Sequence, residues 1–134
     1  MRPTAASIVG EASMPRSPLD PLREDRIRNE AIVDASPEEQ ALGWYYYLRE
    51  RIRFPFPATC AAANPRSPLR KNETATVLRM APENACEHDI LVQIRWQNRK
   101  IAVPLSQLEP VAGDESTQEA IKDWHYWVNR GHVL

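Results

Sequence analysis

The sequence predicts a single α+β domain, with helices beside a small, strongly bent β-sheet or SH3-like barrel. Three observations support this fold class. Two helix-like segments precede residue 53, short β-branched segments with tight turns fill the middle, and a capped amphipathic segment closes the chain. With 134 residues, of which 43% are hydrophobic, the chain can bury the core of one ordinary domain.

The N-terminal segment, residues 1–21, contains four prolines separated mainly by small residues. We therefore expect it to be a disordered extension, and we expect residues 22–134 to form the domain. The first element of that domain is a predicted helix over residues 22–33, LREDRIRNEAIV. The side chains expected along its inner side are Leu22, Ile27 and Ala31.

A second helix is predicted in SPEEQALGWYYYLRERI, residues 36–52. Ser36 is the expected N-cap, Pro37 suits the first helical position, and Glu39 completes a capping box. FPFP ends the helix, because proline removes hydrogen-bond donors and disfavours helix in the residue before it. An apolar stripe with helical spacing runs through Ala41, Tyr45, Leu48 and Ile52, and it is widened by Leu42 and Tyr46.

Four successive aromatic residues, Trp44 to Tyr47, cannot all point to one face of this helix. Tyr45 lies on the apolar stripe, whereas Trp44 and Tyr47 are three residues apart and share another face. We interpret the run as packing, with the sheet on one side of the helix and another helix on the other. Stacking on a ligand is the alternative interpretation.

The middle of the chain is predicted to form strands. TCAAA, residues 59–63, is a candidate, Thr74–Ala81 is another strand, and Asp89–Leu105 is a β-hairpin with its tight turn in QNRK. Pro104 marks a strand end or an edge. The segment VPLSQLEP resembles the strand, short 3₁₀ turn and exit that are common in SH3-like barrels.

The last element is a predicted helix in GDESTQEAIKDWHYWVNRG, residues 113–131. Ser116 and Glu119 repeat the capping-box spacing, and Gly131 suits the position after the helix end. The expected inward face consists of Ala120, Ile121, Trp124, Trp127 and Val128.

Composition excludes several classes of function. No apolar run is long enough to cross a membrane, and the N-terminus lacks a continuous apolar leader, so a cytoplasmic protein is expected. The net charge of −1 gives no general attraction for nucleic acid.

Cys60 and Cys86 are expected to be buried thiols rather than zinc ligands. No catalytic motif is present, so we do not expect an enzyme, and we interpret His125 as an interface histidine.

Carboxylates gather in three places: Asp34, Glu38 and Glu39 near the start of the long helix; Glu83, Glu87 and Asp89 in PENACEHD; and Glu109, Asp114 and Glu115 before the last helix. Helix capping, the helix dipole and a polar turn account for each group structurally. Without an EF-hand loop, any calcium would have to be bound by surface carboxylates and backbone carbonyls.

Glu50 is harder to explain, because it lies in the last turn of a helix, where the dipole disfavours an anion. Free carbonyls also gather there, and carboxylates with carbonyls suit calcium. An ion pair with Arg53 is the alternative. Glu39 and Glu50 are separated by ~16 Å along the helix at ~1.5 Å per residue, so they cannot share an ion, and if both helix ends bind metal there are two sites.

Several long segments resemble the CcbP-type calcium-binding protein family. They are RIRNEAIVDASPEEQALGWYYYL, FPF with the following Ala and Cys, SPL, ILVQIRW, IAVPLSQLEP and the EAI-DWHYWV stretch. The resemblance covers residues 26–131. It implies a small cytoplasmic calcium-binding protein without EF-hands, with a role in calcium sequestration and differentiation signalling. The acidic positions that it matches are Asp34, Glu38, Glu39 and Glu50.

We therefore expect a calcium-binding protein, acting as a buffer or a sensor, with the calcium ion as its ligand. Arg49, Arg51 and Arg53 surround Glu50, and they should weaken a divalent site there. The alternative is a module of SH3-like fold that uses the Arg66–Lys71 loop for a partner. A protein partner is favoured over nucleic acid, because the chain carries no excess of positive charge.

Overall fold

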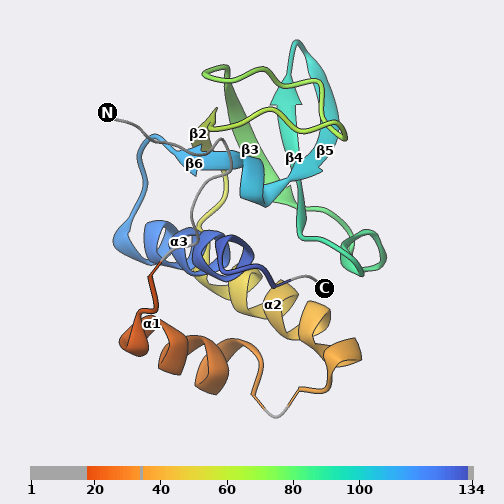
Figure 1. Cartoon of the computed structure of the whole chain (residues 1–134). Coiled ribbons are helices and arrows are strands. Elements are labelled where there is room, and N and C mark those ends of the chain that lie inside the picture. Colours follow the sequence, from red (N-terminus) through yellow and green to blue (C-terminus); the bar gives the residue numbers. More distant parts are fainter. Residues whose placement is uncertain (1–17, 34, 133–134) are drawn as a thin grey trace, which may run out of the picture.

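The computed structural model describes residues 18–33 and 35–132 (Figure 1). This part of the chain contains three α-helices and one five-stranded antiparallel sheet, so the predicted α+β class is confirmed. The helices are α1 (Pro21–Arg26), continued by the π-helical turn η1 (Ile27–Ala31), α2 (Pro37–Arg51) and α3 (Glu115–Asn129). The strands are β2 (Phe56–Cys60), β3 (Thr74–Met80), β4 (Leu91–Trp96), β5 (Arg99–Pro104) and β6 (Leu108–Pro110).

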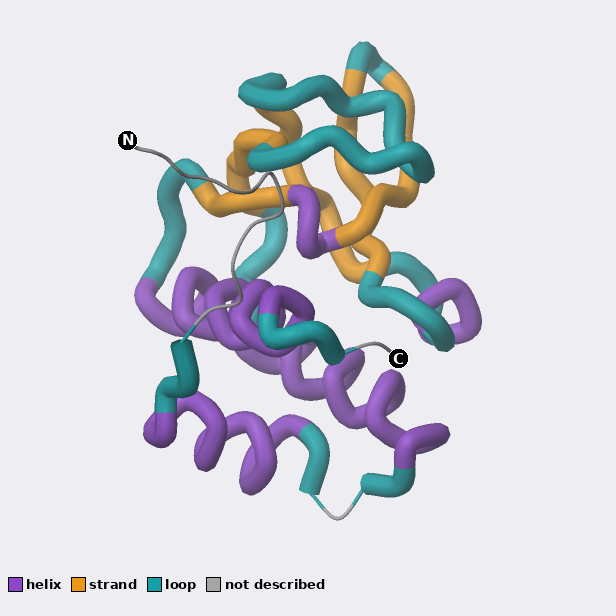
Figure 2. Tube along the Cα trace, viewed as in Figure 1, coloured by secondary structure: helices purple, strands orange, loops and turns teal. Residues whose placement is uncertain are grey.

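The elements form layers, with the sheet on one side of the α2 and α3 pair and α1 on the other (Figure 1). Two 3₁₀ turns connect strands of the sheet: η2 (Glu83–Cys86) lies between β3 and β4, and η3 (Leu105–Gln107) lies between β5 and β6 (Figure 2). The strand order is β5-β4-β3-β2-β6. Because β5 and β6 lie at opposite edges, the sheet is open, and the barrel that the sequence offered as an alternative to a bent sheet does not form.

The predicted hairpin and the closing segment are confirmed. Gln97 and Asn98 both have positive φ, 49° and 61°, as a tight two-residue hairpin turn requires. The predicted strand in TCAAA is wrong, because the strand begins earlier, at Phe56. Phe56, Ala58 and Cys60 alternate into the core, and this strand pairs with β3 on one side and β6 on the other.

The first helix also differs from its prediction. Residues 1–17 of the expected extension lie outside the described residues, but Asp20 and Pro21 form the N-cap and the first residue of α1. No α1 residue is buried, and Leu22 is 83% exposed, so its predicted inward position is wrong. The inward position holds for Ile27 and Ala31 of η1.

The final helix begins at a different cap from the one predicted. Its N-cap is Asp114, whose Oδ1 accepts a hydrogen bond from the Thr117 amide at 2.8 Å. Ser116 instead donates from its hydroxyl to the Arg51 carbonyl at 2.9 Å, which ties the start of α3 to the end of α2. Gly131 has a φ of 95° and follows the C-cap, as predicted.

The aromatic run of α2 packs within the protein. Trp44 and Tyr47 are buried, and Trp44 makes an edge-on contact with Trp124 of α3, with ring centroids 5.0 Å apart. Tyr45 is also buried, and its hydroxyl donates to the Ala81 carbonyl just after β3 at 2.8 Å. The packing interpretation is thus confirmed for these three, although α2 meets the end of β3 rather than the sheet face. Tyr46 is partly exposed.

Gly43 explains how closely η1 approaches α2. A Cβ atom at this position would lie 2.4 Å from the backbone oxygen of Ala31, far inside van der Waals contact. Glycine weakens a helix by about 1 kcal/mol relative to alanine, so its place in mid-helix is explained by this contact.

Candidate functional site

The predicted metal-site residues are spread over both ends of α2. Glu38 is exposed in the first turn, and Glu50 is exposed in the last. Asp34 lies outside the described residues. The structure therefore does not bring Glu38 and Glu50 together.

Glu39 has a structural role in the helix start. Its Oε1 accepts hydrogen bonds from the Ser36 amide at 3.1 Å and from the Ser36 hydroxyl at 2.8 Å. These bonds stabilise the ionised carboxylate, so they hold the pKa of Glu39 below its ordinary value. The predicted capping box is confirmed. One oxygen of this carboxylate is therefore already occupied.

The surroundings of Glu50 do not favour a cation. The guanidinium groups of Arg49 and Arg51 lie over the rings of Tyr46 and Tyr47, at 4.7 and 4.0 Å. Arg53 forms an ion pair with Asp114 at 2.7 Å instead of pairing with Glu50. Arg51 is also paired, with Glu30 at 2.7 Å, so Arg49 is the arginine of this group without an ion pair among the described residues, and its charge opposes a cation near Glu50.

The carbonyl groups at this end of α2 are also partly occupied. The Arg51 carbonyl accepts the hydroxyl of Ser116, and the Leu48 carbonyl accepts the amide of Ile52. Docking of α3 therefore leaves fewer free carbonyls at this helix end. Free carbonyls were part of the reason to expect calcium there.

Most carboxylates in the described residues already have partners. Ion pairs at 4 Å or less engage Asp20, Glu24, Glu30, Asp89, Asp114, Glu119 and Asp123. Among the described residues, those with neither an ion pair nor a hydrogen bond through the carboxylate are Glu38, Glu50, Glu87, Glu109 and Glu115. A ligand cation would meet the least competition at these groups.

Two of these free carboxylates line the same hollow. A groove of about 960 Å³ lies between the first half of α2 and the η2 turn. We call it the α2–η2 groove. Its α2 wall consists of Pro37, Glu38, Ala41, Leu42 and Tyr45, and its opposite wall consists of Glu83, Asn84, Cys86, Glu87 and His88. Glu38 and Glu87 thus meet at one surface, together with Glu83.

Glu83 is held in place by α2. The hydroxyl of Tyr46 donates to its Oε2 at 2.6 Å, and this bond raises the pKa of the tyrosine. That donor is uncharged, so the bond is not an ion pair. The groove therefore carries three carboxylates, Glu38, Glu83 and Glu87, that no described cation neutralises.

These carboxylates are not a closed metal cage. Within residues 18–33 and 35–132, no three His, Cys, Asp or Glu side chains are close enough to hold an ion as they stand. Calcium, however, accepts flexible sets of ~6–8 oxygens at ~2.3–2.6 Å and often includes water. Glu38, Glu83 and Glu87 supply oxygen ligands of the kind that calcium takes, and all three line the same groove.

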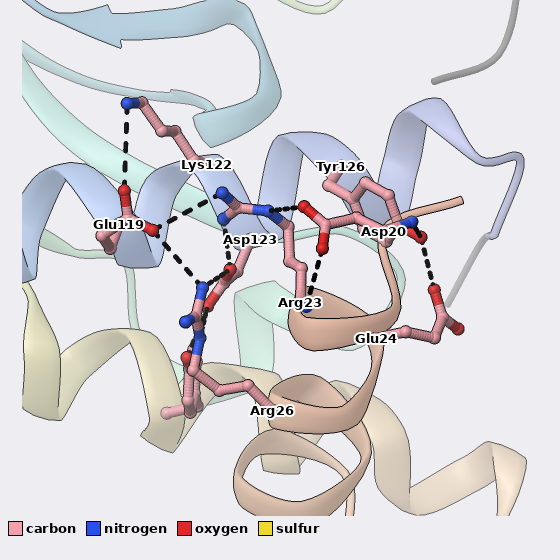
Figure 3. Close-up of polar contacts among 9 residues, drawn as sticks. Asp20, Arg23, Glu24, Arg26, Glu119, Lys122, Asp123 and Tyr126 are labelled. Carbon is pink, nitrogen blue, oxygen red and sulfur yellow. Dashed lines mark hydrogen bonds and ion pairs between the residues drawn. The ribbon is translucent and has the colours of Figure 1, made fainter. Parts of the chain in front are cut away.

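The sequence did not reveal the buried carboxylate that organises the helices. Asp123 of α3 is completely buried, and Arg23 of α1 donates to its Oδ1 at 2.5 Å (Figure 3). Arg26 binds both oxygens, from Nη2 at 2.6 Å and from Nε at 3.0 Å. The Tyr47 hydroxyl adds a bond at 2.5 Å. The sequence could not indicate this arrangement, because Arg23, Arg26 and Tyr47 lie 100, 97 and 76 residues away from Asp123 in the chain.

Two other predictions about reactive side chains are confirmed. Cys60 and Cys86 are buried free thiols. His125 of α3 lies against η3, with Nε2 3.4 Å from the Leu105 carbonyl, and burial lowers its pKa.

The Arg66–Lys71 loop is less basic than its sequence indicates, because Arg66 forms an ion pair with Asp89. No described helix is both long and apolar enough for a membrane span.

Comparisons with known proteins agree with this fold. The family model described as CcbP calcium binding matches residues 25–128. The crystal structure of Anabaena CcbP has a TM-score of 0.77 and 38% identity, over 89% of this chain and 98% of that one. A calcium-binding protein in its calcium-binding form has a TM-score of 0.75 and 39% identity, over 84% of this chain and 94% of that one. No curated protein matches.

Proposed function

Because the chain belongs to the CcbP family of calcium-binding proteins, we propose that it binds calcium at the α2–η2 groove. The observation that carries this proposal is the meeting of Glu38, Glu83 and Glu87 at one surface without a neutralising cation among the described residues. These three carboxylates supply up to five oxygens besides the Glu83 Oε2 that accepts the Tyr46 hydroxyl, and water would complete the shell that calcium prefers.

The arrangement supports a weak, readily exchanging site. Its carboxylates are exposed and have to be drawn together, so part of the binding free energy is spent on ordering side chains. Exposed charges are also screened by salt. We infer a buffering role for this site taken alone, with affinity that falls as ionic strength rises. A cytoplasmic location stays a prediction.

The predicted site residues take different places in this proposal. Glu38 is a direct ligand, whereas Asp34 lies outside the described residues and its role stays a prediction. Glu39 serves mainly as the cap of α2. Glu50 would belong to a separate and weaker site at the other end of the helix, because arginines and an occupied carbonyl surround it.

A calcium titration by calorimetry at low ionic strength tests the proposal. Glu38→Gln, Glu83→Gln and Glu87→Gln should each weaken calcium binding by about three- to tenfold, since each removes one charge near the ion. Glu115→Gln is the matched control. This glutamate is exposed and free of ion pairs in the described structure, and it lies outside the groove.

Two results would contradict the assignment. If the three groove variants titrate like the unmodified protein while Glu50→Gln loses calcium, the site is at the other end of α2. If the unmodified protein shows neither calcium heat nor a change in thermal stability with a chelator, calcium binding itself is absent from this chain.

A further inference from the structure

The α2–η2 groove carries apolar surface that calcium binding does not use. Ala41 and Leu42 belong to the apolar stripe of α2, yet Leu42 remains 43% exposed and Ala41 is only partly covered. Both line the groove, next to the buried ring of Tyr45. Together these side chains give the groove an apolar wall, as ligand-binding grooves have.

The charge of the groove narrows the choice of partner. Glu38 stands on the α2 wall, and Glu83 and Glu87 stand on the opposite wall, so the apolar strip lies between carboxylates. None of the three has a cationic partner among the described residues. A polyanion would be repelled, whereas a segment that presents apolar side chains flanked by lysine or arginine would meet complementary charge on both sides.

We propose that the α2–η2 groove docks a basic amphipathic helical segment of a partner protein, and that calcium competes with it. Apolar side chains with helical spacing would lie against Ala41, Leu42 and Tyr45, as helices lie in hydrophobic grooves elsewhere. Basic side chains would pair with the carboxylates of Glu38, Glu83 and Glu87. The volume of about 960 Å³ suits a short stretch of helix rather than a whole domain.

The calcium competition rests on the proposed function, but the docking does not. Both ligands need the same three carboxylates, so each should lower the affinity for the other by the same factor. Calcium would then release the segment, and the weak calcium site would act as a sensor through its partner.

Fluorescence anisotropy of a labelled KLLKKLLKKLLK peptide tests the docking, first in chelator and low salt. Leu42→Gln should weaken binding about tenfold, because a leucine contact is lost. Leu22→Gln is the matched control, since Leu22 is an exposed helix leucine that does not line the groove. The KSSKKSSKKSSK and ELLEELLEELLE peptides, which lack the apolar or the basic component, should bind at least tenfold more weakly.

Calcium is then added to the same mixtures, and Glu38→Gln and Glu115→Gln are compared. Calcium should displace the peptide from the unmodified protein, and Glu38→Gln should weaken both ligands while Glu115→Gln weakens neither. Equal peptide binding by Leu42→Gln and the unmodified protein would overturn the docking. Peptide binding that passes this test but ignores calcium, while calorimetry still shows calcium bound, would overturn only the competition.

Sedimentation of the unmodified protein without peptide tests whether a second copy of this chain occupies the groove instead. A monomer is expected. A dimer that Leu42→Gln dissociates would show that the groove is filled by a second copy, and it would also overturn the proposal. Absence of any calcium heat together with normal peptide docking would defeat the proposed function and leave the docking in place.

Discussion

The two faces of α2 handle aromatic and charged residues in opposite ways. On one face, Gly43, Trp44 and Tyr47 pack against η1 and α3, and the charge nearby, Asp123, is buried and fully bonded. On the other face, Glu38 and Leu42 line an open groove, with the carboxylate unneutralised and the leucine partly exposed.

This difference separates structural groups from groups that are available to a ligand. Asp123 accepts bonds from two arginines and a tyrosine, so no further ligand can reach it. Burying a charge is tolerated only when it is paired and hydrogen-bonded. Glu38 and Glu87 satisfy neither condition and Glu83 satisfies only the second, but all three remain in solvent, where being unpaired has little effect on stability. A carboxylate is therefore available to a ligand when it has no cationic partner in the fold, and its negative charge alone does not indicate this.

The largest expected effect concerns the packed face. Asp123→Asn should lower the free energy of unfolding by about 3 kcal/mol or more, because it leaves Arg23 and Arg26 clustered without the buried countercharge. Urea denaturation measures this loss. Glu119→Gln, which removes a partly exposed partner of the same arginines, should change stability by less than about 1 kcal/mol. Equal effects of the two variants would erase the contrast between buried and exposed carboxylates.

The close approach of η1 gives the next largest effect. Gly43→Ala should destabilise the protein by about 1–3 kcal/mol, although alanine is the better helix former, because its Cβ would collide with the Ala31 carbonyl. Thermal denaturation with Glu50→Ala as the control for an exposed position on the same helix provides the measurement. A stabilised Gly43→Ala protein would mean that η1 does not press on α2.

Two neighbouring tyrosines offer the most direct comparison of the faces. Tyr47→Phe should lower stability by about 1–3 kcal/mol, because its hydroxyl bonds to the buried carboxylate of Asp123. Tyr46→Phe removes an exposed bond to Glu83, so stability should change by less than about 0.5 kcal/mol. Calcium affinity should respond to Tyr46→Phe and not to Tyr47→Phe. The reverse pattern would place the functional surface on the packed face.

The pH dependence of stability extends the comparison to α3. Burial lowers the pKa of His125 in the folded protein, so the unfolded chain binds the proton more readily. The contribution of His125 to the free energy of unfolding is therefore fully present above the ordinary histidine pKa of about 6.5. It is lost as the pH falls toward the lower pKa of the folded state. We expect a loss of up to about 1 kcal/mol between pH 7.5 and 5, reduced in His125→Gln. Unfolding curves that superimpose over this range would contradict the burial argument.

The smallest expected effect separates the two ends of α2. Glu50→Gln should change calcium affinity less than about twofold, since the neighbouring Arg49 opposes a cation there and the Arg51 carbonyl already accepts the Ser116 hydroxyl. Glu38→Gln should have the larger effect. Calorimetry on the two variants at equal ionic strength decides between the helix ends.

Local rules predicted most of the secondary structure. The capping box at Ser36, the turn at Gln97 and Asn98, and the glycine after α3 follow from chain geometry within a few residues. Errors arose where two local signals competed. Asp114 took the cap predicted for Ser116, whose hydroxyl instead bonds to α2.

The candidate site was predicted only in part, because its two walls come from segments that are far apart in the chain. Glu38 was predicted because it matches an acidic position of the family that the sequence resembles, and the PENACEHD loop was noted as acidic. The sequence could not predict that Glu38 and this loop line one groove. The η2 turn lies beside α2 only because β3, which precedes it, ends next to that helix.

The sequence alone determined the α+β class, the ends of α2 and the membership of a calcium-binding family, since propensity, capping and long matching segments act locally along the chain. The tertiary structure decided which carboxylates are neutralised. Asp123 and Glu38 are the same kind of group in the sequence, but only packing brings Arg23 and Arg26 to the first and leaves the second open. Charge pairing is a contact in space, so no reading along the chain can settle it.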